Sequence, residues 1–176
     1  MALSALFLGC ESRKNEKSSE AKTMSMSKPL LSLAQWSLHK ALFNGDLKAI
    51  DFPNKSVSLG IKAVEYVNQF YIEHVNNSEY WKDLKRRTDD LGVKNLLIMV
   101  DDEGLLGDPD QVKRKKAVEN HYKWVDAANM IGCHSIRVNA FGTGSNDEMM
   151  SSLQDGLGLL AEYAANQNKY LKSDNE

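Results

Sequence analysis

Three features that would each mark a particular class of protein are scarce in this sequence. Two cysteines in 176 residues are too few for the disulfide framework of a small secreted domain. The 22 basic side chains are outnumbered by 24 acidic ones, and the one dense basic cluster, Lys113–Lys116, is interpreted as a solvated helix face, so nucleic acid is not an expected partner. No stretch approaches the roughly 20 apolar residues of a transmembrane helix. What remains, 42% apolar and 26% charged residues, is typical of a globular chain with one core.

The first 28 residues differ in character from the rest of the chain. The apolar and small residues Leu6–Gly9 lead up to Cys10, and the residues from 11 to 28 are polar and rich in Ser, Lys and Glu. An apolar run, a small residue and a cleavage point are the shape of a secretory signal, and a cysteine at that point resembles a bacterial lipoprotein box. We therefore predict a leader and polar tether at residues 1–28, lipid attachment at Cys10, and a place on the periplasmic side of the bacterial cell envelope. The alternative is a chance apolar start on a cytoplasmic protein.

From Leu30 onward one pattern recurs: a helical stretch, then a glycine, then an apolar strand. Gly60, Gly92 and Gly132 lie 32 and 40 residues apart, and each suits the left-handed position that ends a helix. The expected strands are Leu31–Ser37, Ile61–Val67, Val93–Val100 and Cys133–Ala140. Near-continuous apolar runs of this kind are typical of parallel strands that are covered on both faces.

The segments between the expected strands carry helix signals. Asn77 can cap one helix, and Asp108-Pro109 offers a cap and a first-turn proline for the next. Ser145 and Glu148 make a capping box for a fourth helix. This alternation predicts a parallel sheet with right-handed crossovers. Two architectures fit the pattern, namely half of an eight-stranded barrel, whose full length is about 250 residues, and a four-stranded doubly wound sheet.

Particular segments of the sequence favour the barrel. The segments are Ser32–His39, Gly60–Phe70, Trp124–Cys133 and Ile136–Asn139. In this order and spacing they resemble the first two strands, the third helix and the fourth strand of xylose isomerase-like TIM barrel proteins. The resemblance covers about residues 29–168 and leaves a polar tail at residues 169–176. It implies the (β/α)₈ TIM barrel family, present here as an incomplete barrel of about four βα units, with the doubly wound sheet as the alternative.

The resemblance also implies a function. Family members are sugar isomerases and epimerases, which move a proton between carbon atoms of a small sugar, a sugar phosphate or a related polyol. It implies one divalent metal ion, Mn²⁺, Mg²⁺ or Zn²⁺, whose Glu, Asp and His ligands come from the fifth strand onward in the family. No such strand follows Asn168 in this sequence. We therefore expect a truncated chain that holds no metal ligands and is weak or inactive alone.

Active groups of a TIM barrel lie at the C-terminal ends of its strands, and several side chains are expected there. From their places at the strand ends we predict catalysis by Glu65 and by His39, for which the family resemblance is the main support. We predict substrate binding by a second set, Trp36, Asn68, Arg137 and Asn139. The acidic run Asp101–Glu103 follows the third strand and is interpreted as a solvated turn, although hard cations do bind carboxylates.

Side-chain alternation sharpens the prediction for two of these residues. On the second and fourth expected strands, Glu65 and Arg137 have the parity opposite to the most apolar positions, so both should face the barrel interior. A carboxylate is costly to bury without a partner, and Arg137 is the candidate partner of Glu65. The pair could bind substrate or be purely structural. His121 lies on the apolar stripe of the third helix and is interpreted as a packing histidine.

Two other functions remain open. One is a non-catalytic half-barrel, anchored to the envelope, that binds a sugar or a partner protein. The other is a self-contained four-stranded α/β domain of different function. A half-barrel would leave two unpaired strand edges and an open apolar interior, so we expect a homo-oligomer in which two copies complete the barrel. The membrane would be reached only through the lipid anchor.

Overall fold

The computed structural model describes residues 30–173, with side chains described to residue 167. The elements are β1 (Leu33–Ala34), η1 (Gln35–Leu38), α1 (His39–Phe43), η2 (Ala49–Asp51), α2 (Phe52–Ser58), β2 (Ala63–Val67), η3 (Asn68–His74), α3 (Ser78–Leu91), β3 (Lys94–Val100), α4 (Gln111–Ile131), β4 (Ser135–Val138) and α5 (Asn146–Ser173). The predicted leader, with Cys10, lies outside the described residues. None of the helices in the described part is long and apolar enough to cross a membrane.

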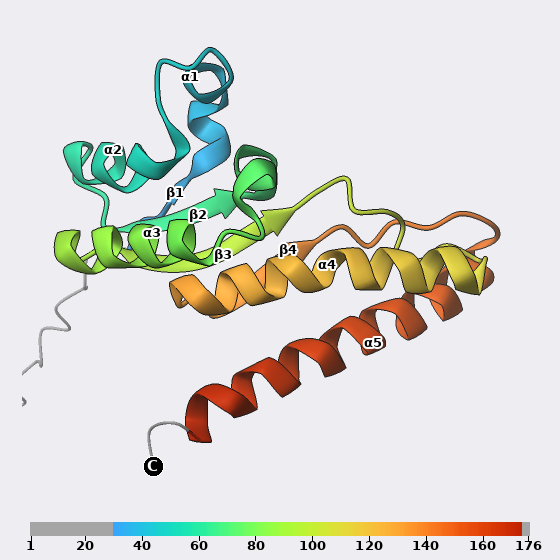
Figure 1. The fold of residues 1–176 in the computed structure, drawn as a ribbon. Helices are drawn as coiled ribbons and strands as arrows, with labels where there is room; N and C mark the ends of the chain where they lie inside the picture. The colour runs from blue at the N-terminus through green and yellow to red at the C-terminus, as the bar shows by residue number, and fades with distance from the viewer. Residues whose placement is uncertain (1–29, 174–176) are drawn as a thin grey trace, which may run out of the picture.

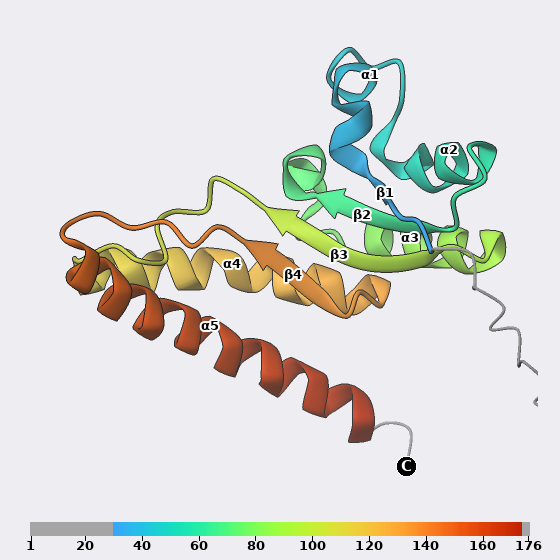
Figure 2. The same ribbon diagram turned by 180° about the vertical axis from the view of Figure 1, so that it is seen from behind.

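The four strands form one parallel sheet in the order β1-β2-β3-β4. A doubly wound sheet reverses its strand order at a switch point, so this sequential order excludes it. Helices α2, α3, α4 and α5 pack against one another in succession. In Figure 1, α3 and α4 lie in front of the strands, and in Figure 2 the strands lie in front of them. The sheet is therefore the wall of an incomplete TIM barrel with four βα units.

Alternation along the strands separates a buried face from an open one. Val64, Tyr66 and Ile98 are fully buried against the helices, where the side chains of Trp81 and Trp124 complete the core. The opposite, concave face carries side chains that are half-buried or exposed, namely Ala63, Glu65, Leu97, Met99 and Arg137. This division follows from the two-residue period of a strand, and the predicted inward parity of Glu65 and Arg137 is confirmed.

The predicted helix ends are confirmed with one correction. Gly60, Gly92 and Gly132 have φ of +78°, +63° and +78°, the left-handed conformation that glycine adopts without a steric cost. The residue that caps α4 is Asp110, whose carboxylate accepts from the backbone N–H of Val112 at 2.8 Å. The predicted cap at Asp108-Pro109 is therefore two residues early.

The capping box at the start of α5 is confirmed. The backbone N–H of Ser145 donates to Oε2 of Glu148 at 2.9 Å, and the hydroxyl of Ser145 donates to the same oxygen at 2.8 Å. These two bonds lower the pKa of Glu148, because they stabilise its charged form. The helix then continues to Ser173, five residues beyond the predicted limit of the barrel domain at residue 168.

The first strand is much shorter than predicted. It ends at Ala34, where the chain turns into η1. From there the side chain of Gln35, rather than the backbone of a continuing strand, makes the hydrogen bond to the end of β2. Oε1 of Gln35 accepts from the backbone N–H of Val67 at 2.9 Å, and Nε2 donates to the hydroxyl of Tyr71 at 2.8 Å. Gln35 is fully buried with both functions of its amide satisfied. Consequently Trp36 lies on a 3₁₀ helix rather than on a strand.

The basic cluster at residues 113–116 is mostly the solvated face that was predicted. Lys113, Lys115 and Lys116 are exposed, but Arg114 is 9% exposed and joins α4 to α5. Its Nε lies 2.7 Å from Oδ2 of Asp155. An arginine that is nearly buried needs such a partner, so this member of the cluster has a structural role.

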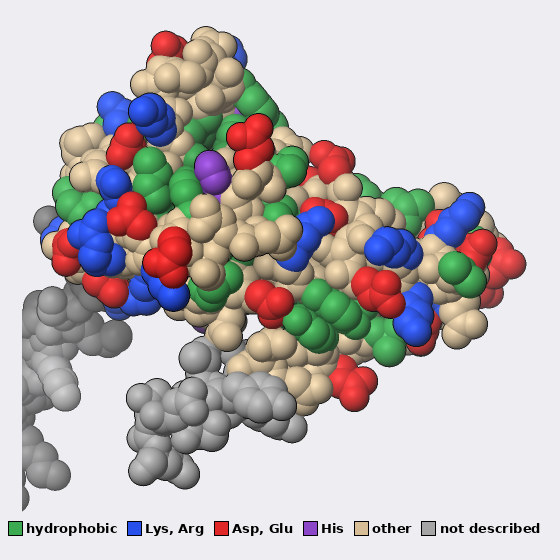
Figure 3. Space-filling view, viewed as in Figure 1, with side chains coloured by type: hydrophobic (Ala, Val, Ile, Leu, Met, Phe, Trp, Pro, Cys, Tyr) green, Lys and Arg blue, Asp and Glu red, His purple; other side chains and the backbone are tan. Residues whose placement is uncertain are grey.

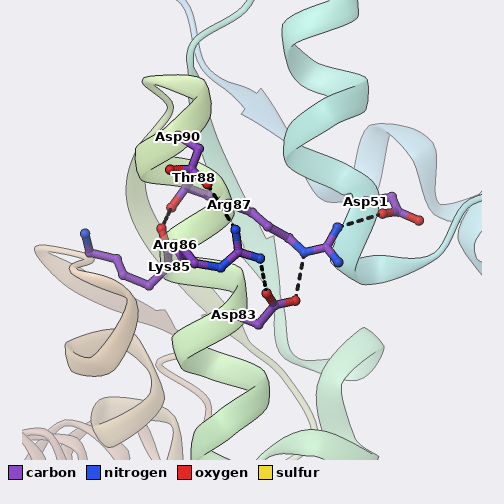
Figure 4. A network of polar contacts seen from close by, with 7 residues as sticks. All are labelled: Asp51, Asp83, Lys85, Arg86, Arg87, Thr88 and Asp90. Atoms are coloured by element: carbon purple, nitrogen blue, oxygen red, sulfur yellow. Dashed lines mark hydrogen bonds and ion pairs between the residues drawn. The ribbon is translucent and has the colours of Figure 1, made fainter.

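The outer surface of α3 is strongly charged with both signs, as the left part of Figure 3 shows. Figure 4 shows the underlying network: Arg87 contacts Asp83 at 2.8 Å and Asp51 at 3.3 Å, and Arg86 contacts Asp83 at 2.6 Å and Asp90 at 3.1 Å. The hydrogen bonds from Arg87 and Arg86 hold the pKa of Asp83 below its ordinary value. Solvent screens these pairs, so they support the helix only slightly and mark it as the outside of the barrel.

Candidate functional site

A hollow of about 480 Å³ opens on the concave face at the C-terminal ends of the strands. Strand register brings Val67, Met99 and Arg137 to one level, because Val67 pairs with Met99 and Met99 pairs with Arg137. The hollow is lined by these three residues and by Ala34, Trp36, Ser37 and Asp101. Parallel strands thus bring together side chains from four segments of the chain. We call this cavity the strand-end hollow.

Three polar side chains form a connected network at the hollow. Nη1 of Arg137 donates to Oδ1 of Asn139 at 2.6 Å, and Nδ2 of Asn139 donates to Oδ1 of Asp101 at 2.7 Å. Nη2 of Arg137 also lies 3.7 Å from that carboxylate oxygen. The network offers a ligand a guanidinium and a carboxylate held in fixed relation to each other, which suits recognition of hydroxyl and carbonyl groups.

The predicted pair between Glu65 and Arg137 is not formed. Strand register places Glu65 opposite Leu97, and Leu97 opposite Ser135, so Glu65 lies one level deeper in the barrel than Arg137 and is separated from it by β3. The carboxylate of Glu65 instead accepts a hydrogen bond from the hydroxyl of Ser32 at 2.6 Å. The alternation of side chains along each strand correctly predicted that both residues lie on the same face of the sheet. It carries no information about how far along the barrel axis each residue lies.

Trp36 and His39 belong to an aromatic cluster at the rim. Their rings stack with centroids 4.8 Å apart, and Phe43 and Phe70 pack beside them with centroids 5.0 Å apart. Nδ1 of His39 lies 2.7 Å from the carbonyl oxygen of Trp36. Because a carbonyl only accepts, Nδ1 carries the hydrogen and Nε2 of a neutral ring is left as an acceptor. Trp36 is 46% exposed and presents its ring to the hollow.

Asn68, predicted to bind substrate, is instead fully committed to the backbone. It is 1% exposed, its Nδ2 donates to the carbonyl of Asp101 at 2.8 Å, and its Oδ1 accepts from the backbone N–H of Asp101 at 3.1 Å. These paired bonds join the end of β2 to the end of β3. In this structure Asn68 therefore positions Asp101 at the hollow.

The acidic run after β3 divides in three directions. Asp101 enters the polar network, Asp102 is exposed and accepts from Nε2 of Gln69 at 2.9 Å, and Glu103 turns toward α4. The carboxylate of Glu103 accepts from Nε1 of Trp124 at 2.6 Å and pairs with Lys123 at 2.9 Å. The prediction of a solvated turn holds for Asp102 alone.

The family implies a divalent metal ion, which needs several carboxylate or imidazole ligands close together. Between residues 30 and 167, no three side chains among His, Cys, Asp and Glu gather where they could hold a metal ion. The nearest carboxylates, Asp101 and Glu65, each accept a hydrogen bond from another side chain, Asn139 and Ser32 respectively. The described residues by themselves therefore do not fit a metal centre.

Sequence reasoning missed two residues that organise the site. Asp101 was grouped with its acidic neighbours, although its position directly after β3 is the place where a barrel carries functional groups. Gln35 was treated as part of a strand, although a polar residue in an apolar run is a sign that its amide has buried partners. The interpretation of His121 as a buried helix residue is confirmed, since it is 3% exposed.

Comparisons with known proteins agree with the barrel. The model of a family described as Xylose isomerase-like TIM barrel matches residues 53–171. A solved structure of a protein from Sinorhizobium meliloti 1021 is 18% identical with a TM-score of 0.58, over 78% of this chain and 47% of that one. The 3-keto-D-glucoside 4-epimerase YcjR from E. coli is 17% identical with a TM-score of 0.55, over 69% of this chain and 48% of that one.

The two likenesses to solved structures concern the fold. The chain spans about half the length of each of these structures. No curated protein matches the sequence.

Proposed function

Because the chain belongs to the xylose isomerase-like TIM barrel family, we propose that it acts in sugar isomerisation or epimerisation and binds the sugar in the strand-end hollow. The observation that carries the proposal is the Asp101–Asn139–Arg137 network beside the ring of Trp36. The hollow lies where barrels of this architecture carry their active groups. Since the matched structures are about twice as long, the activity of the whole protein is part of the proposal.

The hollow suits a small hydroxylated ring or chain. The apolar lining residues Trp36, Val67 and Met99 can cover the C–H groups of a sugar. Beside them, the guanidinium of Arg137 is a donor and the carboxylate of Asp101 is an acceptor. A sugar presents both kinds of surface, so the apolar and polar residues together fix its orientation.

Proton transfer needs a base beside the carbon that loses its proton, and we propose Glu65 for this role. Its carboxylate lies on the concave face and is oriented by Ser32. Glu65 lies one level below the residues that line the strand-end hollow, so the proposal requires the reacting carbon of the sugar to extend below the hollow to this carboxylate. Glu65 takes the proton from the carbon next to the carbonyl group, the electron pair moves to the carbonyl oxygen, and Arg137 stabilises the charge that develops there. Return of the proton from Glu65 to the neighbouring carbon completes an isomerisation. In an epimerisation Glu65 keeps the proton it removed, and water supplies a proton to the other face of the same carbon. His39 can exchange a proton with a substrate hydroxyl through Nε2.

Deuterium exchange and binding test the proposal separately. The chain is incubated with D-xylose or D-fructose in D₂O, with and without Mn²⁺, and ¹H NMR follows loss of the C–H signal next to the carbonyl. We expect Glu65→Gln to abolish exchange and retain binding. Arg137→Gln should weaken binding about tenfold, the effect of losing one charge-assisted hydrogen bond at a partly exposed site. Arg86→Gln, on the outer face of α3, is the matched control.

Each readout can contradict the proposal. Unchanged sugar affinity in the Arg137 variant would exclude the strand-end hollow as the binding site. Exchange that persists in the Glu65 variant would exclude this residue as the base. Binding without any exchange in the wild-type chain would favour the non-catalytic, sugar-binding half-barrel.

We further propose that Cys10 carries the lipid anchor and that two copies associate through the open edges of β1 and β4. The support for the anchor is the sequence around Cys10. The support for association is that β1 and β4 are the outer strands of the described sheet. Cys10→Ser should move the protein from the membrane to the soluble fraction, and light scattering should give twice the chain mass. A soluble wild-type protein or a stable monomer would contradict the respective part.

A further inference from the structure

A second cavity, of about 270 Å³, lies beside the strand-end hollow and shares no lining residue with it. We call it the side pocket. It is enclosed by the loop after β3, the loop after β4 and the N-terminal half of α4. Its lining residues are Val100, Asp102, Glu103, Gly104, Leu105, His121, Asn139 and Phe141. The two cavities meet at the hydrogen bond between Asn139, which lines the side pocket, and Asp101, which lines the strand-end hollow.

His121 contributes an unused nitrogen atom to the side pocket. The ring is 3% exposed, and Nδ1 lies 2.7 Å from the carbonyl oxygen of Ala117, one turn earlier on α4. The carbonyl can only accept, so Nδ1 carries the hydrogen, and the neutral ring keeps its lone pair on Nε2. Among the described residues Nε2 has no hydrogen-bond partner. In this part of the chain, every side-chain nitrogen or oxygen atom that is fully enclosed has a hydrogen-bond partner. Since Nε2 has none, it must be partly open to solvent.

The other polar groups of the side pocket are largely occupied. Both carboxylate oxygens of Glu103 are bonded, one to Trp124 and one to Lys123. The amide of Asn139 accepts a hydrogen bond from Arg137 and donates one to Asp101. Among the lining side chains, the open groups are one acceptor on His121 and the carboxylate of Asp102, which accepts only from Gln69. These side chains therefore favour a ligand that donates hydrogen bonds.

Charge further restricts the class of ligand. Burial lowers the pKa of His121, so its ring is neutral near pH 7. The charge of Glu103 is balanced by Lys123, and Asp102 is exposed to solvent. An ammonium group would thus find no desolvated counter-charge, and an anion would meet two acceptors. An uncharged donor is preferred, and Leu105 with Phe141 can cover its carbon skeleton.

We propose that the side pocket is a separate binding site for a small uncharged polyol, whose hydroxyl groups donate to Nε2 of His121 and to the carboxylate of Asp102. Its volume lies near the lower end of ligand pockets, about 300 Å³, which suits a ligand of a few carbon atoms. The site is distinct from the strand-end hollow and does not depend on the function proposed for it.

Imidazole nitrogen NMR of the full chain tests the proposal directly. With ¹⁵N-labelled histidine, Nε2 of His121 should give the signal of a nitrogen without hydrogen, and xylitol should shift that signal saturably. His121→Asn keeps an amide donor for the carbonyl of Ala117 but lacks the second nitrogen. We expect this variant to bind xylitol about tenfold more weakly in calorimetry, the effect of an unsatisfied hydroxyl.

A second variant avoids the core. Asp102 has a φ of +63°, so Asp102→Gly removes the carboxylate at a position where glycine fits the backbone, and xylitol affinity should fall about fivefold. Trp36→Leu alters the strand-end hollow, and the aromatic neighbours of Trp36 are His39, Phe43 and Phe70, none of which lines the side pocket. It is the matched control and should leave the response of His121 unchanged. Retention of that response separates this site from the function proposed above.

Several results would overturn the site. They are a hydrogen on Nε2, no saturable shift with xylitol, or unchanged affinity in both variants. A shift produced by 2-aminoethanol or inorganic phosphate but not by xylitol would refute the ligand class. Loss of the His121 response in the Trp36 variant would show that the polyol binds in the strand-end hollow instead.

Discussion

Two glycines in α5 allow the packing of this helix to be measured separately from its helix propensity. Gly156 is buried, and a Cβ built on it would overlap the backbone carbonyl oxygen of Leu106 and lie 3.3 Å from Cγ of Arg114. Gly158, one half-turn away, is exposed and would meet nothing within 4 Å. Substitution by alanine adds the same helix propensity at both positions, about 1 kcal/mol. Any difference between the variants is therefore the cost of the overlap.

The structure determines the size of that cost. Leu106 is fully buried, and the next residue, Gly107, donates its backbone N–H to the carbonyl of Phe141 at 2.8 Å, so the carbonyl of Leu106 cannot move away easily. α5 must shift instead, and overpacking of this kind costs about 1–3 kcal/mol. Gly158→Ala should raise the free energy of unfolding by about 1 kcal/mol and the melting temperature by about 2–4 °C. Gly156→Ala should be less stable than Gly158→Ala by about 1–3 kcal/mol.

Urea denaturation followed by far-ultraviolet circular dichroism measures both variants against the wild type. The slopes of the three transitions should agree, so that the midpoints report stability. If Gly156→Ala proved as stable as Gly158→Ala, the close approach of α5 to the loop after β3 would be wrong.

Three further predictions concern buried groups. Asn95 bonds to the hydroxyl of Tyr66 at 2.6 Å and to the carbonyl of Ile131 at 2.7 Å, and Asn95→Ala leaves both groups without this partner. The free energy of unfolding measured in urea should fall by about 2–4 kcal/mol. An unchanged midpoint would contradict the network. Burial lowers the pKa of His121 below 6.5, so on acidification the unfolded chain binds a proton before the folded chain does. The free energy of unfolding should therefore be highest above about pH 6.5 and decrease below it. In His121→Asn this decrease should be smaller. Burial raises the pKa of Cys133 to about 12, so iodoacetamide should label this thiol far more slowly at pH 8 than a free cysteine, and rapid labelling of Cys10→Ser protein would show that the thiol is exposed.

Local signals in the sequence were sufficient for the C-terminal ends of three helices and for the start of α5. The three glycines that end helices and the capping box at Ser145 act within one turn, so each can be recognised without knowledge of the fold. The strand order was not visible in the same way, because alternation of helix and strand is common to barrels and doubly wound sheets. It required the resemblance to a family.

The site was harder to predict because it depends on register. Parity placed Glu65 and Arg137 on the concave face, but the irregular pairing between Val64 and Glu65 on β2 shifts one strand against the next. The shift has no local signal, and the polar side chain of Gln35 in an apolar run indicates buried partners without showing that β1 ends there. The position directly after β3 makes Asp101 a candidate, but its contacts with Arg137 and Asn139 form only once β3 and β4 are aligned, so the sequence does not show which network it joins.

The contact between the loops after β3 and β4 has a consequence for how this end of the barrel moves. The two loops are joined by the bridge between Gly107 and Gly142, where a side chain on Gly142 would collide with the backbone of Gly107. One loop also rests on α5 through Leu106, and the other leads directly into that helix. The strand ends and α5 are thereby coupled mechanically, so that a displacement of the helix is transmitted to Asn139 and to the cavities on either side of it.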